Sequence, residues 1–299
     1  MVIKMILNVS GRTDIVAFYS KWFINRYQEG YVDVRNPFNP KLVSRINFNN
    51  VDAILFCTKN PIPIINYLEK IKKPIIFHIT LTPYKEDIEP SVPNKTKIID
   101  AIKKISNIVG IENVYVRYDP IFLNDKYTLE YHKKAFSKLC NLLNGYVKHF
   151  IVSFIDDYKN VRKNMPILNL KEFTDKDYEE IGKSFSASAQ KYGMTVGTCA
   201  EKNTLVEYGF IPSECLSHTK AYKLTGKTYN TWKARKNTTC KCVETVDIGV
   251  YNTCKHLCKY CYANFDENQI DNNIKKHNPN SSLLIGNLQY DDIIKERIK

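Results

Sequence analysis

The sequence predicts an α/β protein built on a parallel sheet and wound as a TIM-like (β/α) barrel. Short apolar runs of strand length alternate with longer segments of helical periodicity along most of the chain, and this alternation is typical of βα units. The chain has 299 residues, of which 43% are hydrophobic. That is enough for one large barrel domain, and no second core is required.

Seven strands are expected, each a short run rich in apolar residues that gives way to polar ones. They cover residues 6–9, 53–57, 75–81, 114–118, 150–155, 194–198 and 246–250. Apolar residues recur at helical spacing within 98–109 and again within 129–143, which predicts two helices on the outside of the barrel.

One domain is expected over residues 1–265, with two irregular parts. A polar loop that contains three cysteines covers 252–263, and an excursion without clean periodicity covers 201–245. Residues 266–299 are rich in Asn, Asp and Lys. We expect them to form a tail packed on the surface of the barrel.

Charge and cysteine content limit the class of protein. The formal net charge is +13, which suits a polyanionic partner, although the lysines are spread among many helices and a merely solvated surface is the stronger interpretation. Nine cysteines without a secretion signal indicate metal or redox use. The apolar start of the chain is too short for a signal peptide or spanning helix, so we expect a cytoplasmic protein with no membrane association.

Polar side chains follow most of the predicted strands, where the carboxyl ends of parallel strands gather ligands. His78, Thr80 and Thr82 share one face of their strand, which should point into the barrel. Arg117 and Asp119 also lie together, either to act on a substrate or to form a structural salt bridge. His78 is a better candidate for substrate contact than His256, which lies in the cysteine-containing loop.

Three cysteines form a Cys-x3-Cys-x2-Cys run: Cys254, Cys258 and Cys261. Soft thiolates select zinc, copper(I) or iron-sulfur clusters, and a cubane cluster normally takes four of them. A triplet therefore predicts a cluster with one open iron. Zinc is the alternative, with Cys240 and Cys242 completing the site.

A second group of cysteines has the size of a closed tetrathiolate site. It consists of Cys199 at a strand end and of Cys215, Cys240 and Cys242 in the excursion. A second cluster or a structural zinc would explain how the excursion dispenses with a hydrophobic pattern. Scattered buried thiols are the other interpretation. Cys57 and Cys140 are better interpreted as packing residues.

The cysteine triplet, with Tyr260 before its last member, resembles the signature of the radical S-adenosylmethionine (radical SAM) superfamily. The wider string from Cys254 to Ala263 looks most like the spore photoproduct lyase and DNA-repair photolyase branch. The whole chain also resembles a bacterial family of unknown function with a C-terminal radical-SAM-like cluster. The matching segments are 10–19, 34–39, 58–61, 117–120 and 198–201.

This resemblance implies a 4Fe-4S cluster on the three thiolates, with S-adenosylmethionine on the open iron and a flavodoxin- or ferredoxin-type electron donor. Reduction would then give a 5′-deoxyadenosyl radical. A nucleic acid or nucleotide is the favoured substrate, and a small metabolite or peptide is nearly as plausible. The alternative from another class is a non-catalytic binding protein stabilised by zinc or clusters.

In typical members of the superfamily the triplet follows the first strand of the barrel, whereas here it follows the last predicted strand. A circular permutation reconciles the two, because neighbours in a barrel need not be neighbours in sequence. Residues 10–14 then stand where the superfamily binds the amino group of the cofactor, in place of Gly-Gly-Glu. The residues expected to contact S-adenosylmethionine are Ser10, Arg12, Asp14, Thr80, Thr82 and Asp156.

Overall fold

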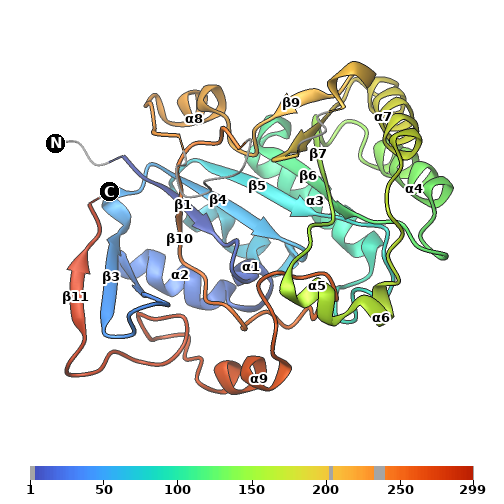
Figure 1. Cartoon of the computed structure of the whole chain (residues 1–299). Coiled ribbons are helices and arrows are strands. Elements are labelled where there is room, and N and C mark those ends of the chain that lie inside the picture. Colours follow the sequence, from blue (N-terminus) through green and yellow to red (C-terminus); the bar gives the residue numbers. More distant parts are fainter. Residues whose placement is uncertain (1–3, 202–204, 232–239, 299) are drawn as a thin grey trace.

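A computed structural model describes residues 4–201, 205–231 and 240–298. Its centre is an eight-stranded sheet with the order β10-β1-β4-β5-β6-β7-β8-β9 (Figure 1). All neighbouring strands are parallel. The strands are β1 (Ile6–Val9), β4 (Ala53–Thr58), β5 (Ile75–Thr80), β6 (Val114–Ile121), β7 (His149–Phe154), β8 (Thr195–Cys199), β9 (Ile211–Ser213) and β10 (Val246–Asp247).

The α/β class and the seven predicted strand positions are confirmed. A closed barrel is not found, because among the described residues no pairing joins β9 to β10. The strand predicted over 246–250 is also shorter than expected. The carboxylate of Asp247 accepts hydrogen bonds from the backbone N–H groups of Gly11 and Gly249, and these bonds replace further sheet pairing.

Helices cover one face of the sheet. Within this sheet β1 is followed by β4, β5, β6, β7 and β8 in chain order. Right-handed crossovers that all run in one direction place their helices on the same side. The longest are α3 (Lys95–Val109), α4 (Leu129–Leu142) and α7 (Asp175–Gln190). Both predicted helices are thus confirmed, as α3 and α4. The Phe136 and Phe185 rings stack at 3.9 Å and join α4 to α7 within the main core.

The other helices are short. They are α1 (Ile15–Phe18), α2 (Ser20–Glu29), η1 (Phe48–Asn50), η2 (Ile62–Lys70), η3 (Ile111–Asn113), α5 (Lys159–Lys163), α6 (Met165–Leu168), η4 (Val206–Tyr208), α8 (His218–Thr225) and α9 (Glu267–Lys275). No helix in the described parts of the chain has the length and apolar composition needed to cross a membrane.

The opposite face of the sheet is covered by the excursion between β8 and β10. Leu216, Ala221 and Val243 form a small separate core with residues of β1, β4 and β5, such as Leu55 and Ile76. The excursion also contains η4, β9 and α8. Part of the excursion therefore packs over the strands, while β9 extends the sheet itself, and the excursion has more regular structure than its sequence predicts.

A second sheet lies beside the first. It joins β2 (Tyr31–Arg35), β3 (Leu42–Asn47) and β11 (Ile293–Glu296), with β3 in the middle. None of these strands was predicted. Figure 1 shows β11, in red, alongside β3. The indole N–H of Trp22 in α2 donates to the Ser281 carbonyl at 2.8 Å, so the C-terminal residues are anchored to α2 as well as to β3.

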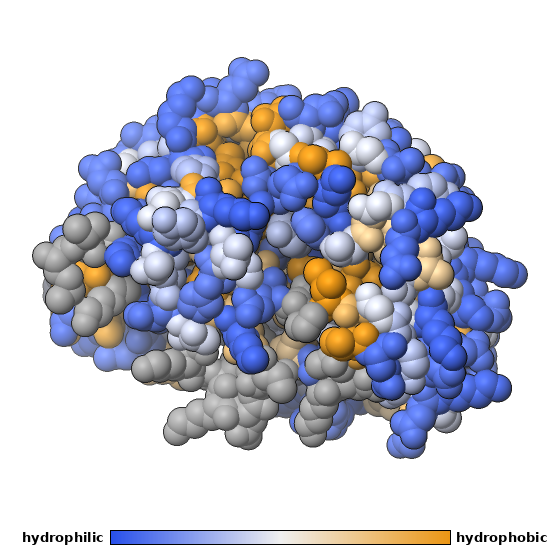
Figure 2. Space-filling view, turned by 90° about the horizontal axis from the view of Figure 1, so that it is seen from above, coloured by the Kyte–Doolittle hydropathy of each residue, from blue (hydrophilic) through white to orange (hydrophobic). Residues whose placement is uncertain are grey.

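The surface is mostly hydrophilic on the face seen from the top of Figure 1. In that view hydrophobic residues gather in separate groups between hydrophilic ones (Figure 2).

Candidate functional site: the cysteine loop beyond β10

The loop of residues 252–263, called here the cysteine loop, begins five residues after β10 and packs on the segment that follows β1. The hydroxyl of Thr253 donates to that of Thr13 at 2.8 Å. The hydroxyl of Tyr19 donates to the Thr253 carbonyl at 2.6 Å. The loop therefore lies at the carboxyl ends of two neighbouring strands, where ligands collect in parallel α/β folds.

The three thiols of this loop lie within electrostatic reach of one another. Burial, the nearby Asp14 carboxylate and the thiols of Cys261 and Cys258 raise the pKa of Cys254 well above its ordinary value. Burial also raises the pKa of Cys258, where the Lys59 ammonium opposes it. Two buried thiols and one partly buried thiol within electrostatic reach of one another disfavour the thiolate form, and a bound cationic centre would reverse this preference.

Side-chain amides hold the backbone of the cysteine loop in place. Asn160 donates to the carbonyl of Cys261 at 2.9 Å, Asn164 to that of Lys259 at 2.7 Å, and Asn264 to that of Cys254 at 2.5 Å. The backbone N–H of Ala263 donates to the sulfur of Cys261 at 3.3 Å. Hydrogen bonds of this kind to sulfur stabilise thiolates and adjust the potential of a cluster.

Two residues of the loop, Asn252 and Leu257, have left-handed backbone angles, with φ of 53° and 56°. Leucine avoids this region, so Leu257 stores local strain that the surrounding contacts must offset. Strain of this kind clusters at functional sites. Leu257 lies between His256 and Cys258. The strain there makes the cysteine loop a stronger candidate for a functional site than the spacing of its cysteines alone does.

Asp14 connects the cysteine loop to the sheet. One carboxylate oxygen accepts from the Thr58 hydroxyl and from the Ala17 N–H, both at 2.8 Å. The other accepts from the Lys59 N–H at 2.8 Å and lies 3.0 Å from Nε2 of His256. The remaining ring nitrogen of His256 lies 3.2 Å from the Ser91 carbonyl. Both nitrogens of His256 are thus engaged, and its role here is to position the loop.

Glu89 is a buried carboxylate beside the cysteine loop that the sequence did not reveal. It accepts from the Thr82 hydroxyl at 2.6 Å, from Lys59 at 2.9 Å, and also from Lys95 and the Tyr260 hydroxyl. Burial alone would raise the pKa of Glu89, but the charges of Lys59 and Lys95 outweigh it and lower the pKa to about 2. We call Glu89, Lys59, Lys95, Thr82 and Tyr260 the Glu89 cluster.

Five of the six predicted cofactor contacts, all except Thr80, have side-chain hydrogen-bond partners among the described residues: Ser10, Arg12, Asp14, Thr82 and Asp156. The Ser10 hydroxyl and the Arg12 guanidinium both bond to Asp247 at 2.9 Å, which ties the ends of β1 and β10 together. Thr82 belongs to the Glu89 cluster, whereas Thr80 is partly buried at the end of β5. Asp156 is exposed and accepts from the Tyr158 hydroxyl at 2.8 Å.

The three predicted catalytic residues meet on the strand ends. The Nε atom of Arg117 donates to Asp119 at 2.8 Å, so the ion pair between them forms. Its Nη1 atom donates to the sulfur of Cys215 at 2.8 Å. Burial and the neighbouring Arg117 charge lower the pKa of His78 to about 3. Its Nε2 atom makes no hydrogen bond to any described residue.

Glu201 is a second carboxylate that the sequence did not identify. It lies two residues beyond β8 and accepts from the Phe154 N–H at 2.9 Å. Burial raises the pKa of Glu201 to about 7; that backbone bond opposes the shift, and the nearby carboxylates of Asp156 and Asp119 add to it. A carboxyl that titrates near neutral pH suits proton transfer. The position of Glu201 just beyond a predicted strand was the only feature of the sequence that pointed to it.

The remaining predicted metal ligands are Cys199, Cys215, Cys240 and Cys242, and Arg117 contacts the sulfur of Cys215. Cys199 and Cys215 form a disulfide, and the thiol of Cys242 contacts that of Cys240. Cys140 is fully buried in the main core, and Cys57 packs against the smaller one. In the parts of the chain that the structure describes, no three Cys, His, Asp or Glu side chains surround a position for a single metal ion.

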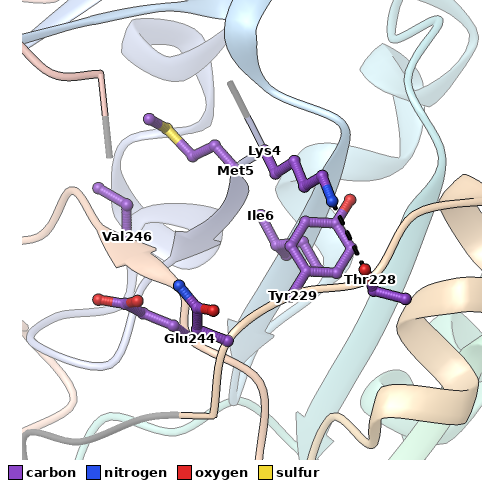
Figure 3. Close-up of a pocket in the computed structure, with 8 residues that line it drawn as sticks. Lys4, Met5, Ile6, Thr228, Tyr229, Glu244 and Val246 are labelled. Carbon is purple, nitrogen blue, oxygen red and sulfur yellow. Dashed lines mark hydrogen bonds between the residues drawn. The ribbon is translucent and has the colours of Figure 1, made fainter. Parts of the chain in front are cut away.

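A surface pocket lies away from these residues, at the amino ends of β1 and β10. It is lined by Met5, Ile6, Tyr229 and Val246, among others, and the Lys4 ammonium bonds to Thr228 across it at 3.5 Å (Figure 3). The cysteine loop lies at the opposite ends of the same strands. This pocket therefore has no part in the candidate site.

Comparison with known families supports the broader of the two resemblances. The family described as Domain of unknown function (DUF1848) matches residues 6–263. The chain belongs to this family. The match of the DUF1848 domain ends at Ala263, the last residue of the cysteine loop, so it includes all three cysteines. No match was found among curated proteins.

Proposed function

We propose that the protein is a radical SAM-type enzyme that holds a 4Fe-4S cluster on Cys254, Cys258 and Cys261. The observation that carries this proposal is that one clamped loop at the carboxyl ends of parallel strands holds three thiols, of which those of Cys254 and Cys258 are buried and that of Cys261 is partly buried. Three thiolates on one loop provide ligands for three irons and leave the fourth open. A single zinc ion would need four ligands around one point.

The order of strands supports a permuted (β/α) barrel as the underlying architecture. Reading the sheet from its edge gives β10 first and β1 second, followed by β4 to β8 in chain order. A superfamily member whose first strand had moved to the C-terminal end of the chain would have this order. Leu7 pairs with Val246 and Asn8 with Asp247, so the strand before the cysteine loop neighbours the N-terminal strand.

With S-adenosylmethionine on its open iron, the reduced cluster would supply a 5′-deoxyadenosyl radical. The protein's own residues would bind and orient the cofactor and would shield the radical from solvent. The Lys59 ammonium near Cys258 offsets negative charge beside the cluster. Glu89 fixes Lys59 and Tyr260 in position. Glu201, with a pKa of about 7, would hold or release a proton near Asp119.

For the substrate we propose a nucleic acid or a nucleotide, and for the reductant a flavodoxin- or ferredoxin-type protein. The support for the substrate is the net charge of +13 together with the photolyase-like cysteine string. Arg117, with two donors facing Asp119 and one facing Cys215, is the cationic residue best placed to orient an anionic group at the strand ends.

The test is anaerobic reconstitution with iron and sulfide, followed by reduction and an assay for 5′-deoxyadenosine and methionine. We expect a brown protein that cleaves S-adenosylmethionine. Cys258→Ala should lose this cleavage. Cys140→Ala is the matched control, because Cys140 is equally buried but lies on helix α4 in the main core, and it should retain cleavage.

Two results would overturn the proposal. One is a colourless protein that takes up zinc on the triplet, which would favour a non-catalytic metal-stabilised protein. The other is a cluster-loaded protein that leaves S-adenosylmethionine intact.

A further inference from the structure

Four cysteines that are distant in sequence converge beside the ends of β8 and β9. Cys199 is the last residue of β8, and its pairing with Ser213 of β9 brings Cys215 within bonding distance. The backbone of Val243 donates to the Leu216 carbonyl at 3.0 Å, which places Cys242 next to Cys215. We call Cys199, Cys215, Cys240 and Cys242 the tetracysteine group.

Hydrogen-bond donors face two of these sulfur atoms, those of Cys215 and Cys242. Nη1 of Arg117 lies 2.8 Å from the sulfur of Cys215. The backbones of Leu216 and Cys215 both hydrogen-bond to the thiol of Cys242, which in turn contacts Cys240. Four thiolates around a zinc ion or a 4Fe-4S cluster leave a net negative charge, and N–H donors in the surroundings stabilise it. Packing alone does not require such donors.

The group is also accessible. Cys199, Cys215 and Cys240 are partly exposed, and Cys242 is buried beneath them. Small reductants and metal ions can therefore reach it without unfolding of the excursion. The neighbouring His78 ring is buried and has an Nε2 atom without a partner among the described residues, so the surroundings include an unused polar group.

In the disulfide form the four sulfur atoms do not surround one metal position. We propose that the tetracysteine group is a second metal centre of tetrathiolate type, which fills once the Cys199–Cys215 disulfide is reduced and the freed thiols turn toward those of Cys240 and Cys242. A dithiol reductant transfers two electrons and two protons to the disulfide and is itself oxidised to a disulfide. The two new thiols join those of Cys240 and Cys242, and metal binding releases the four thiol protons. Zinc and a 4Fe-4S cluster both accept four thiolates.

The centre would connect the end of β8 to the excursion, part of which packs on the face of the sheet opposite the helices. Its existence does not depend on radical chemistry at the cysteine loop. The two proposals can therefore fail separately.

The test uses the full chain with Cys254, Cys258 and Cys261 all replaced by Ala, so that only the second site remains. This protein is reduced anaerobically with dithiothreitol, offered either zinc or iron with sulfide, and desalted. We expect about one zinc, or about four irons with equal sulfide, per chain. Uptake in the zinc arm or in the iron arm identifies the metal.

Further replacement of Cys242 or, separately, of the more exposed Cys240 by Ser should abolish this uptake, whereas Cys140→Ser should not. Protein left in the disulfide form should take up no metal until it is reduced. Circular dichroism checks that the variants remain folded. Absence of both metals from the reduced triple variant, or equal uptake by the folded Cys240→Ser variant, would overturn the proposal.

Discussion

At the scale of single residues, Glu89 joins three parts of the chain beside the cysteine loop. Its carboxylate accepts from Thr82 just beyond β5, from Lys59 just beyond β4 and from Lys95 at the start of α3. It also accepts from Tyr260 inside the loop. A buried carboxylate with two cationic partners is expensive to leave unpaired. Glu89 therefore contributes both to stability and to the position of Tyr260 next to Cys261.

We predict that Glu89→Gln lowers the free energy of unfolding by about 3 kcal/mol near neutral pH, because two ammonium groups lose their buried counter-charge. The pKa of Glu89 is lowered from 4.5 to about 2 in the folded protein. Its stabilising effect is therefore complete above about pH 4.5 and is lost as the pH falls toward 2. Urea unfolding of both proteins at a series of pH values measures this difference.

Glu86→Gln serves as the control, since Glu86 is exposed in the same segment, and it should change the free energy of unfolding by less than about 0.5 kcal/mol. A difference between wild type and Glu89→Gln that is the same at pH 3 and pH 7 would contradict the assigned pKa.

At the scale of elements, the segments that follow β1 and β10 approach each other very closely. A Cβ atom at Gly249 would lie 1.9 Å from the Ser10 hydroxyl oxygen and 2.9 Å from its Cβ. Only glycine allows this approach, which lets Asp247 accept from Ser10 and Arg12. The contact aligns the cysteine loop with the end of β1.

We predict that Gly249→Ala lowers the free energy of unfolding by about 2–3 kcal/mol through overpacking. Ser10→Gly removes both of the closest atoms, so Gly249→Ala should cost less in that background. A double-mutant cycle from urea unfolding should then give a coupling of about 1 kcal/mol or more between the two positions. Strictly additive effects would mean that the strand ends move apart rather than clash.

At the scale of the whole molecule, the sheet is wound in one direction with helices on one face and the excursion on the other. This arrangement leaves the carboxyl ends of the strands to the cysteine loop, the Glu89 cluster and Arg117. The net charge of +13 belongs to the same scale, because its field extends over the surface and steers anionic partners.

If a nucleic acid is the substrate, affinity for a single-stranded oligonucleotide should fall at least about tenfold between roughly 50 and 200 mM salt, because phosphate contacts release counterions. Fluorescence anisotropy measures this. An uncharged peptide nucleic acid of the same base sequence is the matched control and should bind weakly at all salt concentrations. Equal affinity for the two polymers, or affinity independent of salt, would favour a small metabolite or a peptide.

Apolar periodicity and ligand spacing are local properties of the chain, so they were enough to predict the α/β class, the seven strand positions, two of the long helices and the cysteine triplet. The radical SAM assignment also comes from the sequence and stays a prediction. Contacts between distant segments were decided by the tertiary structure alone. Tyr260 and Glu89 are 171 residues apart in the chain, and the sequence around either residue does not indicate contact with the other.

The same reason explains the other differences. The strands of the second sheet pair across the length of the chain, with β11 beside β3, and the short β10 is defined by its neighbour β1. The disulfide between Cys199 and Cys215 depends on the pairing of β8 with β9. Local sequence determines which segments become strands, and burial of their shared faces decides which of them become neighbours.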